Sequence, residues 1–545
     1  MTMLLAASPM FATEQWVAPG TPIVPPTLPA VGNADAAISV EPLVPRPNTR
    51  SCVVELFSRR EFTGAVPHAI SFQPPADCPG PWARVVLEND LDVNAGIQYD
   101  RSARLELGGV NLYTGTTMEP RKNLSLRWHV ERDVTDYSTL FASAASGSAT
   151  LENYLDAVHD SRFHWRSRLI FYAADGANPA PRFPDIVMPI APKPVEISRA
   201  APMIERIVTW PRNIERMAID VLTMPQKSDE MWQHCVPNSV LPPEVQSQDS
   251  CGYPFRESEV RIDGILAGFA PVYPWVFTGG MGAWNWTLIP GIGTLDLQPY
   301  RVDLTPFAAQ MNDGQPHRIA VSVRGAGDYM ATTATLLAWR DAGRAVVTGG
   351  ILRNTLKPAA LTVTGKITLP GAKGVPVDIV ARRRGGVAGY VNGSHGRVTT
   401  RIDQAMHSTV RRTQHGNEAD TRLLTHVNTR TVISGGGRDR RERRVEQFPL
   451  EWGVATGPTS TRRTFSDLDQ SLVRDETITD ATGTRRRVVR QTVSPRTLPD
   501  EKTTLYPEMV QSTVSIHISD SVAGCYDRTV TVVAQSVTAA RDGCR

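Results

Sequence analysis

The 545-residue sequence predicts an all-β protein made of antiparallel β-sandwiches or jelly rolls. Short runs of alternating apolar and polar residues recur along the chain, and Gly, Pro, Asn and Asp separate them. Alternation with a period of two places one face of a strand in a core and the other in solvent. Helical periodicity is sparse, and many short strands at close spacing are typical of sandwiches and jelly rolls.

Individual strands can be assigned from this pattern. The clearest runs are residues 82–87, 103–107, 260–263 and 319–323. Asp263-Gly264 closes the third run and predicts a hairpin turn. Residues 203–222 have some character of an amphipathic helix, but Pro211 interrupts the segment, so we expect two strands there.

The composition of the chain divides it into four parts, because a chain of this length exceeds one hydrophobic core. Residues 1–46 contain a signal-like start and a proline-rich arm with little capacity to fold alone. Residues 47–195 and 196–345 are expected to form two sandwich domains, separated near a second proline-rich stretch. Residues 346–545 contain few aromatics and many Thr, Val and Arg, which predicts a C-terminal β-rich domain. Within it, Gly435–Arg444 is predicted as a solvated arginine-rich loop, with an anion-binding patch as the alternative.

The chain is expected to work outside the reducing cytoplasm, in a secreted or periplasmic location. Its first residues, MTMLLAASPMFA, resemble the end of a secretory signal peptide. Six cysteines fall into three couples that are close in sequence, which favours disulfides in an oxidising compartment. The predicted bridges are Cys52–Cys78, Cys235–Cys251 and Cys525–Cys544.

Charge and hydropathy give no sign of a nucleic-acid or membrane partner. A net charge of +3 is small for this length and argues neither for nor against nucleic acid, so a solvated neutral surface is expected and no nucleic-acid partner. No apolar stretch approaches the ~20 residues of a membrane span. No zinc-ligand spacing or phosphate-binding loop is visible, so neither a metal nor a cofactor is expected. The oligomeric state is not determined by the sequence.

The candidate chemistry rests on carboxylates in aromatic company, because no Gly-x-Ser-x-Gly nucleophile elbow is present and the eleven histidines are scattered. A single acid of this kind is more often a turn or surface residue. Carboxylates that share a cleft acquire different pKa values, which suits water activation together with protonation of a leaving group. Composition leaves open whether such a group cleaves a glycosidic bond or an amide. The candidates are Asp100, Glu119, Asp229, Glu230 and Glu257.

Several segments resemble the peptide:N-glycanase A family of amidases. In the first half they are GIQYDRSARLELGGVNL, TMEP and WHVERDVTDYSTL. In the second half they are WPRNIERMAIDVL, DEMW, VRIDGILAG, WVFTGG, IPGIGTLDLQPYRVDLTPF and NDGQPHRIAVSV. The resemblance covers about residues 45–345 in order, and does not extend with the same clarity into the last third.

The resemblance implies a fold of two packed jelly rolls and an activity. The activity is hydrolysis of the amide between asparagine and the first N-acetylglucosamine of an N-glycoprotein or glycopeptide, which converts Asn to Asp. The family is also distantly similar to the peptide:N-glycanase F type, in which an aromatic-Asp-Arg triplet supplies the principal catalytic Asp. Tyr99-Asp100-Arg101 matches that triplet, so Asp100 is the first candidate.

The second carboxylate stays open at this point. The resemblance implies a Glu near a Phe-Arg pair, but here Glu257 follows Phe255-Arg256, and Glu230 and Glu119 are competitors. Residues expected to bind substrate are Tyr99, Arg101, Arg256, Trp232, Trp284 and Trp286. The chain lacks cysteines at Asn94 and Thr116 and a basic residue at Thr287, where the family often has them. Two alternatives remain, an endo-acting glycoside hydrolase on N-glycans and a non-catalytic carbohydrate-binding protein.

Overall fold

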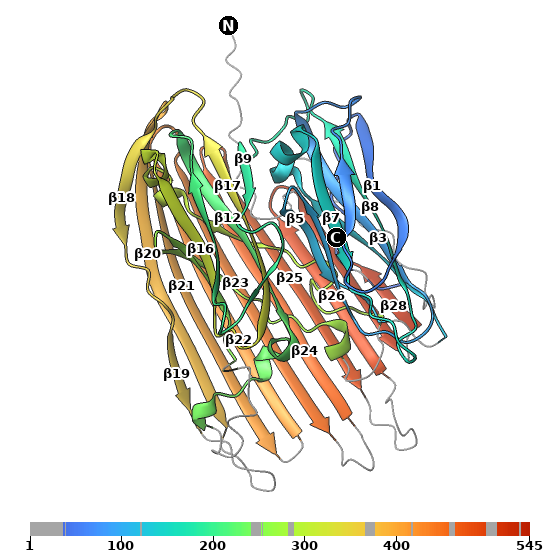
Figure 1. Cartoon of the computed structure of the whole chain (residues 1–545). Helices are drawn as coiled ribbons and strands as arrows, with labels where there is room; N and C mark the ends of the chain where they lie inside the picture. The colour runs from blue at the N-terminus through green and yellow to red at the C-terminus, as the bar shows by residue number, and fades with distance from the viewer. Residues whose placement is uncertain are drawn as a thin grey trace.

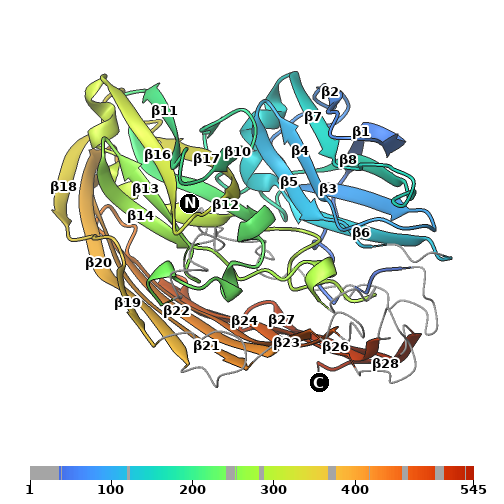
Figure 2. The same cartoon turned by 60° about the horizontal axis from the view of Figure 1, so that its bottom comes forward.

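Two sandwiches lie side by side on one very large sheet in the computed structural model of the chain (Figures 1 and 2). The structure describes residues 36–38, 40–119, 123–240, 252, 254–281, 288–365, 376–415, 418–456, 464–497, 509–533 and 536–544. The strand pairs between its named strands are antiparallel, and the predicted all-β class is therefore confirmed.

The first jelly roll consists of two four-stranded sheets packed face to face. One sheet has the order β1-β8-β3-β6, with β1 (Ser51–Phe62), β8 (Phe163–Ala173), β3 (Trp82–Val93) and β6 (Leu126–Asp133). The other has the order β2-β7-β4-β5, with β2 (His68–Phe72), β7 (Ala145–Leu151), β4 (Ser102–Leu107) and β5 (Val110–Thr116). Large aromatic side chains fill the space between the sheets, among them Phe62, Phe141 and Trp165, which are fully buried.

The second jelly roll repeats this plan. One sheet has the order β10-β17-β12-β15, with β10 (Val195–Ile197), β17 (Tyr329–Arg340), β12 (Ile214–Gln226) and β15 (Tyr300–Asp303). Strand β9 (Ile186–Pro189) also pairs with β17, although its residues precede position 196. The facing sheet has the order β11-β16-β13-β14, with β11 (Met203–Thr209), β16 (Pro316–Arg324), β13 (Glu257–Ile262) and β14 (Ile265–Pro271).

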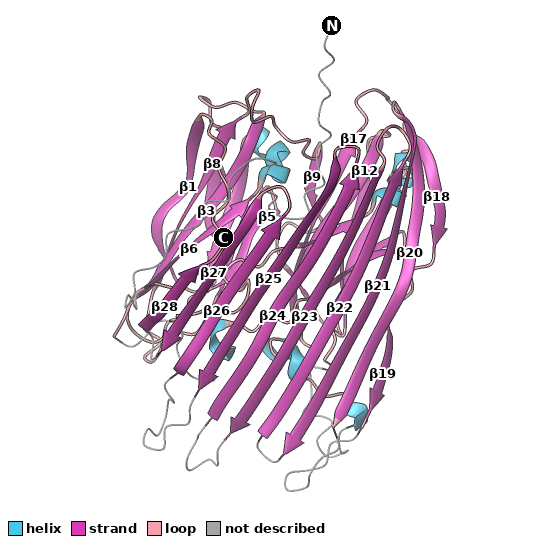
Figure 3. Ribbon diagram, turned by 180° about the vertical axis from the view of Figure 1, so that it is seen from behind, coloured by secondary structure: helices cyan, strands magenta, loops and turns pink. Residues whose placement is uncertain are grey.

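The C-terminal part forms one eleven-stranded sheet that curves beneath both jelly rolls (Figure 2). From β20 onward its strands lie side by side in chain order, and β18 and β19 both pair with β20 (Figure 3). They are β18 (Thr348–Asn354), β19 (Ala360–Thr364), β20 (Val377–Gly393), β21 (Gly396–His415), β22 (Glu418–Ser434), β23 (Arg440–Thr456), β24 (Thr464–Asp480), β25 (Gly483–Thr497), β26 (Met509–Asp520), β27 (Gly524–Val533) and β28 (Ser536–Asp542). The inner face of this sheet joins the same hydrophobic core as the jelly rolls, through residues such as Leu450, Val493 and Val530.

Helical structure is limited to short 3₁₀ segments in the described residues. They are η1 (Thr135–Ala142), η2 (Lys227–Asp229), η3 (Trp232–His234), η4 (Asn238–Val240), η6 (Thr278–Gly280), η7 (Thr305–Phe307) and η8 (Gln310–Asp313). None of the helices in these residues has the length and apolar character needed to cross a membrane.

The end of the proline-rich arm, residues 36–38 and 40–46, is a strap between the first jelly roll and the C-terminal sheet. The Ala37 N–H donates to the Arg127 carbonyl at 2.9 Å, which ties the strap to the first jelly roll. The Tyr526 hydroxyl donates to the Val40 carbonyl at 2.9 Å, which ties it to β27. The Ile38 N–H also donates to the Leu288 carbonyl at 2.7 Å, and Val40 is buried, so these contacts fix the conformation of the arm.

The strand predictions from sequence are confirmed at each of the runs named above. Residues 82–87, 103–107 and 319–323 lie in β3, β4 and β16, and residues 203–222 form β11 and part of β12. Asp263 and Gly264, with φ of 50° and 81°, close the hairpin of β13 and β14. The prediction of a solvated loop is wrong for the second half of Gly435–Arg444, which begins β23.

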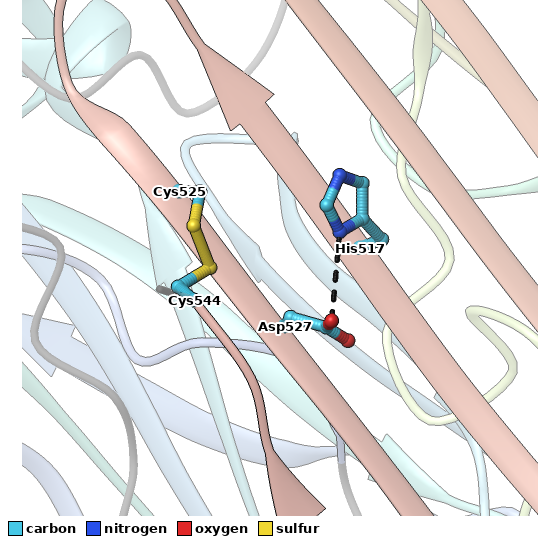
Figure 4. Close-up of a disulfide and its surroundings, with 4 residues drawn as sticks. All are labelled: His517, Cys525, Asp527 and Cys544. Atoms are coloured by element: carbon cyan, nitrogen blue, oxygen red, sulfur yellow. Dashed lines mark ion pairs between the residues drawn. A yellow bond between two sulfur atoms is a disulfide. The ribbon is translucent and has the colours of Figure 1, made fainter.

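The disulfide predictions have three different outcomes. The Cys525–Cys544 bridge is confirmed and fastens the chain end beyond β28 to β27 (Figure 4). In the same view the neighbouring side chains of His517 and Asp527 form an ion pair at 3.7 Å. Cys235 is disulfide-bonded, while its predicted partner Cys251 lies outside the described residues.

The predicted Cys52–Cys78 bridge is wrong, because both cysteines are free. Cys52 lies on β1 opposite Phe171 of β8, and the Cys78 thiol donates to the Phe171 carbonyl at 3.7 Å. Burial and the adjacent Cys52 raise the pKa of Cys78 to about 11. The buried thiol is therefore a weak nucleophile in the folded protein.

Candidate active site

Asp100 lies where the chain enters β4, and the β4–β5 hairpin fixes its position. Pairing continues past the last β4–β5 pair, because the Arg101 N–H donates to Thr117 Oγ1 at 2.8 Å and the Thr117 N–H donates to the Arg101 carbonyl at 2.9 Å. One residue further along, the Asp100 N–H donates to Glu119 Oε1 at 3.3 Å. One backbone hydrogen bond and two that side chains accept therefore hold the two acids next to each other.

Gly279 of the second jelly roll closes the site from the opposite side. Its N–H donates to Asp100 Oδ2 at 3.1 Å. A Cβ atom at Gly279 would lie 2.7 Å from Glu119 Oε1 and 3.1 Å from Asp100 Oδ1. Both carboxylates thus touch this glycine, and a residue with a side chain would displace them.

Glu230 is the third acid of the group. It follows η2 on the loop after β12, and its N–H donates to the Lys227 carbonyl at 3.1 Å. The neighbouring Asp229 accepts hydrogen bonds from the backbone N–H groups of Asp328 and Tyr329 at 2.7 and 2.8 Å, and its carboxylate lies 2.5 Å from Arg256. These buried contacts fix the loop that presents Glu230.

The pKa values of this group are shifted by burial and by mutual repulsion. Burial, and then the charge of Asp100, raise the pKa of Glu230 from 4.5 to about 7. Burial also raises the pKa of Asp100, while the Gly279 N–H and the Arg101 charge oppose that rise. Adjacent carboxylates of which one stays ionised and the other holds a proton can serve as a base and an acid at one site.

An aromatic rim, made of Tyr99, Tyr154 and His159, lies about Arg101, the residue after Asp100. Tyr99 is 46% exposed and Tyr154 is 51% exposed, and the Arg101 guanidinium lies 5.5 Å from the centre of each ring. His159 packs against Tyr99 with ring centres 4.6 Å apart. Exposed aromatic faces beside hydrogen-bonding groups can stack on a sugar ring.

Glu257 lies apart from the group of Asp100, Glu119 and Glu230. Its side chain is fully buried on β13, with the carboxylate 2.7 Å from Arg383 of β20 in the C-terminal sheet. Arg383 also lies 2.7 Å from Glu259, so the three groups form a buried cluster between the second jelly roll and the C-terminal sheet. Burial raises the pKa of Glu257 to about 8 despite the nearby Arg383 charge.

Of the six predicted substrate-binding residues, two lie on the aromatic rim, two lie inside the protein and two lie outside the described residues. Tyr99 and Arg101 lie on the rim. Trp232 and Arg256 are each 2% exposed and support the loop of Glu230 from inside. Trp284 and Trp286 lie outside the described residues. Sequence reasoning missed Gly279, Tyr154 and His159, and the Gly-Gly pair at 279–280 was the available signal for the first of these.

Two other features of the described residues lie apart from the three acids. Glu88, His129 and Glu131 have atoms spaced for a metal ion, but Arg46 donates to both carboxylates, at 2.6 and 2.7 Å, so a cation would compete with its charge. A cavity of about 240 Å³ lies between the strap, the second jelly roll and the C-terminal sheet, and its lining includes Glu41 but none of the three acids.

Comparison with known proteins gives a family, a relative and several solved structures. The model of the peptide N-acetyl-β-D-glucosaminyl asparaginase amidase A family matches residues 42–368. A peptide-N4-(N-acetyl-β-glucosaminyl)asparagine amidase A from Prunus dulcis is 27% identical over 383 residues, and the match covers 66% of each chain, just under two thirds of that relative.

The solved structures include peptide:N-glycanase F from Flavobacterium meningosepticum and PNGF-II. Peptide:N-glycanase F is 10% identical, with a TM-score of 0.34 and coverage of 53% of this chain and 96% of that chain. PNGF-II is 11% identical, with a TM-score of 0.36 and coverage of 53% and 65%.

The raised pKa of Glu230 predicts a pH-dependent cost to stability. Below about pH 4.5 Glu230 is protonated in both the folded and the unfolded chain, so it costs nothing. As the pH rises through 7, the unfolded chain is ionised and the folded chain must bury the charge. Glu230→Gln should therefore increase the free energy of unfolding at pH 8, by on the order of 1–3 kcal/mol, and leave it unchanged at pH 4.

Urea unfolding of the two proteins at both pH values measures this difference. Glu205→Gln is the matched control, because Glu205 is exposed on β11 and should show no pH-dependent gain. A Glu230→Gln protein that is no more stable than the wild type at pH 8 would contradict the raised pKa.

Proposed function

The chain belongs to the peptide N-acetyl-β-D-glucosaminyl asparaginase amidase A family, and we propose that it hydrolyses the side-chain amide that joins asparagine to the first N-acetylglucosamine of an N-linked glycan. The peptide asparagine becomes aspartate, and the glycan leaves as a glycosylamine. The observation that carries the proposal is the meeting of Asp100 and Glu119 at Gly279, on the boundary between the jelly rolls. Glu230 lies near enough for the Asp100 charge to help raise its pKa to about 7.

In this proposal Asp100 is the general base. The Gly279 N–H and the Arg101 charge both favour its ionised form, which is the form that can accept a proton from water. The activated water attacks the amide carbonyl. Glu119 accepts a hydrogen bond from the Asp100 backbone N–H, which orients the Glu119 carboxylate, while the Gly279 N–H orients that of Asp100.

Glu230 is the general acid. With a pKa of about 7 it holds a proton in weakly acidic solution and can deliver it to the departing glycosylamine nitrogen. The ionised Asp100 is one cause of that pKa, so the base maintains the acid in its protonated state. Activity is accordingly expected to fall as the pH rises above 7.

The aromatic rim supplies sugar binding. Tyr99 and Tyr154 flank Arg101 and present exposed ring faces next to Asp100. Stacking of the first N-acetylglucosamine on this rim would place its amide linkage over the carboxylates. The compartment in the proposal is secreted or periplasmic, which the Cys525–Cys544 bridge supports.

Mass spectrometry of a digested N-glycopeptide tests the reaction. The expected peptide product carries Asp at the former glycosylation site, and the released glycan retains both core N-acetylglucosamine residues. A peptide that keeps one sugar on Asn would instead identify an endo-acting glycoside hydrolase. An unchanged glycopeptide would identify a carbohydrate-binding protein.

Asp100→Asn should lower the rate of glycopeptide hydrolysis by a factor on the order of 10² or more and leave the melting temperature nearly unchanged. The substitution keeps the shape of the side chain and removes the base. Glu257→Gln is the matched comparison, because Glu257 lies in the buried cluster with Arg383 and is expected to affect stability more than rate. A near wild-type rate for Asp100→Asn, or a larger rate loss for Glu257→Gln, would assign the chemistry to another carboxylate.

Gly279→Ala should reduce the rate about ten-fold or more, because the added methyl group occupies the space of Glu119 Oε1 and Asp100 Oδ1. Both contacts are with the ends of side chains that can move, so the fold should tolerate the change. Gly350→Ala is the control, since nothing lies within 4 Å of its Cβ position. Rates and melting temperatures of the three proteins are compared, and an unaffected Gly279→Ala enzyme would show that the carboxylates need not stay in place.

A further inference from the structure

Three residues form a row across the inner side of the C-terminal sheet. Arg412 of β21 is the direct partner of Thr421 of β22, and Thr421 is the direct partner of Trp452 of β23. These strands lie side by side in the middle of the sheet (Figure 3). Thr421 and Trp452 are buried, with exposures of 0% and 3%, although neither belongs to a jelly roll.

His234 sits on this row and contacts all three of its members. His234 Nδ1 lies 2.7 Å from Thr421 Oγ1, and the imidazole centre is 4.3 Å from the indole ring of Trp452. The Arg412 guanidinium donates to the His234 carbonyl. Burial and the Arg412 charge lower the pKa of His234 to about 3, so the ring stays neutral and the contact is insensitive to pH.

His234 belongs to the compact loop that carries Glu230. The Glu230 N–H donates to the Lys227 carbonyl, and the His234 N–H donates to the Met231 carbonyl at 2.9 Å. These turns join Glu230 to His234 with little freedom between them. A displacement of His234 would therefore move Glu230.

Trp452 also contacts the loop that carries Gly279. A Cβ atom at Gly280 would lie 3.5 Å from Trp452 Cη2 and 3.6 Å from Met231 Cε. The edge of the indole ring thus lies close to Gly280, which follows Gly279, the residue that donates a hydrogen bond to Asp100. Nearby, the Gln470 side chain of β24 donates to the Pro274 carbonyl at 2.6 Å and holds the start of the same loop.

We propose that Trp452 is a positioning residue for the reaction, which sets the distance between Glu230 and the Asp100–Gly279 pair by packing against both of their loops. The inference rests on the proposed function and assigns a role to the C-terminal sheet. The two loops come from one jelly roll, and Asp100 comes from the other. A rigid strand beneath the loops gives them a common support that loop backbone alone does not provide.

The first test is a comparison of kcat, KM and the pH profile. Trp452→Phe removes the indole edge nearest Gly280, and should lower kcat about ten-fold or more with a small change in KM. Because Asp100 raises the pKa of Glu230, a wider separation should also move the alkaline limb of kcat/KM, which reports the free enzyme, from about pH 7 toward lower pH. Thr421→Val removes only the hydrogen bond to His234. It should also lower kcat and move the alkaline limb toward lower pH, but by less than Trp452→Phe does.

Val530→Ala is the control for a general loss of stability. Val530 is fully buried in the same sheet on β27, four strands from β23, which corresponds to roughly 19 Å. This variant should lower the melting temperature and leave kcat and the pH limb of the folded enzyme unchanged. A wild-type kcat and pH limb in Trp452→Phe, or equal losses in Trp452→Phe and Val530→Ala, would overturn the proposal.

A second measurement does not depend on the activity. The gain in urea midpoint that Glu230→Gln gives at pH 8 is measured in the wild type and in the Trp452→Phe background. A smaller gain in the variant supports the positioning role even if the wild type hydrolyses no glycopeptide, in which case only the proposed function fails. An identical gain in both backgrounds shows that Trp452 does not control the surroundings of Glu230.

Discussion

The hydrogen bond from the Gly279 N–H to Asp100 is the contact on which the candidate site depends, because it links the two jelly rolls within the site. This hydrogen bond forms only if the two jelly rolls keep a constant position relative to each other. Residues 294–297 hold them in that position, since the Thr116 N–H donates to the Thr294 carbonyl at 2.8 Å and the Leu297 N–H donates to the Thr114 carbonyl at 2.9 Å. Backbone pairing at the edge of β5 therefore orients one jelly roll on the other.

The C-terminal sheet is attached by polar contacts as well as by apolar packing. Arg383 lies between Glu257 and Glu259, and the Tyr300 hydroxyl donates to Glu446 Oε2 at 2.9 Å. Loss of one partner from a buried ion pair costs about 3–5 kcal/mol, because the remaining charge stays buried. Any shift of the C-terminal sheet relative to the second jelly roll would break such contacts and cost free energy. The sheet is therefore a suitable support for loops that must be placed accurately.

The position of Glu257 depends on a contact that the local sequence does not encode. Nearly every residue of β13 is buried, because the strand is central in its sheet and the C-terminal sheet lies against it. The pattern Phe-Arg-Glu gives no information about that neighbouring sheet. In the same way, the sequence alone predicts that the arginines of residues 440–444 are solvated, because it does not show the strand pairing. Alternation along β23 then buries Arg440 and Arg444, where Glu442 and Glu446 lie beside them.

The sequence by itself determined the strands, the hairpin at Asp263-Gly264 and the candidacy of Asp100, because these depend on periodicity, turn chemistry and a short motif that are all local. It also named Glu119 and Glu230, but only as competitors of Glu257 for the role of the second carboxylate. Only the tertiary structure decided which acids meet, that Trp232 and Arg256 support a loop from inside, and that the C-terminal sheet reaches the site. Those outcomes depend on contacts between residues up to about two hundred positions apart, such as His234 with Thr421, and on the burial that such contacts create. Neither the contacts nor the burial is encoded in the spacing of neighbouring residues.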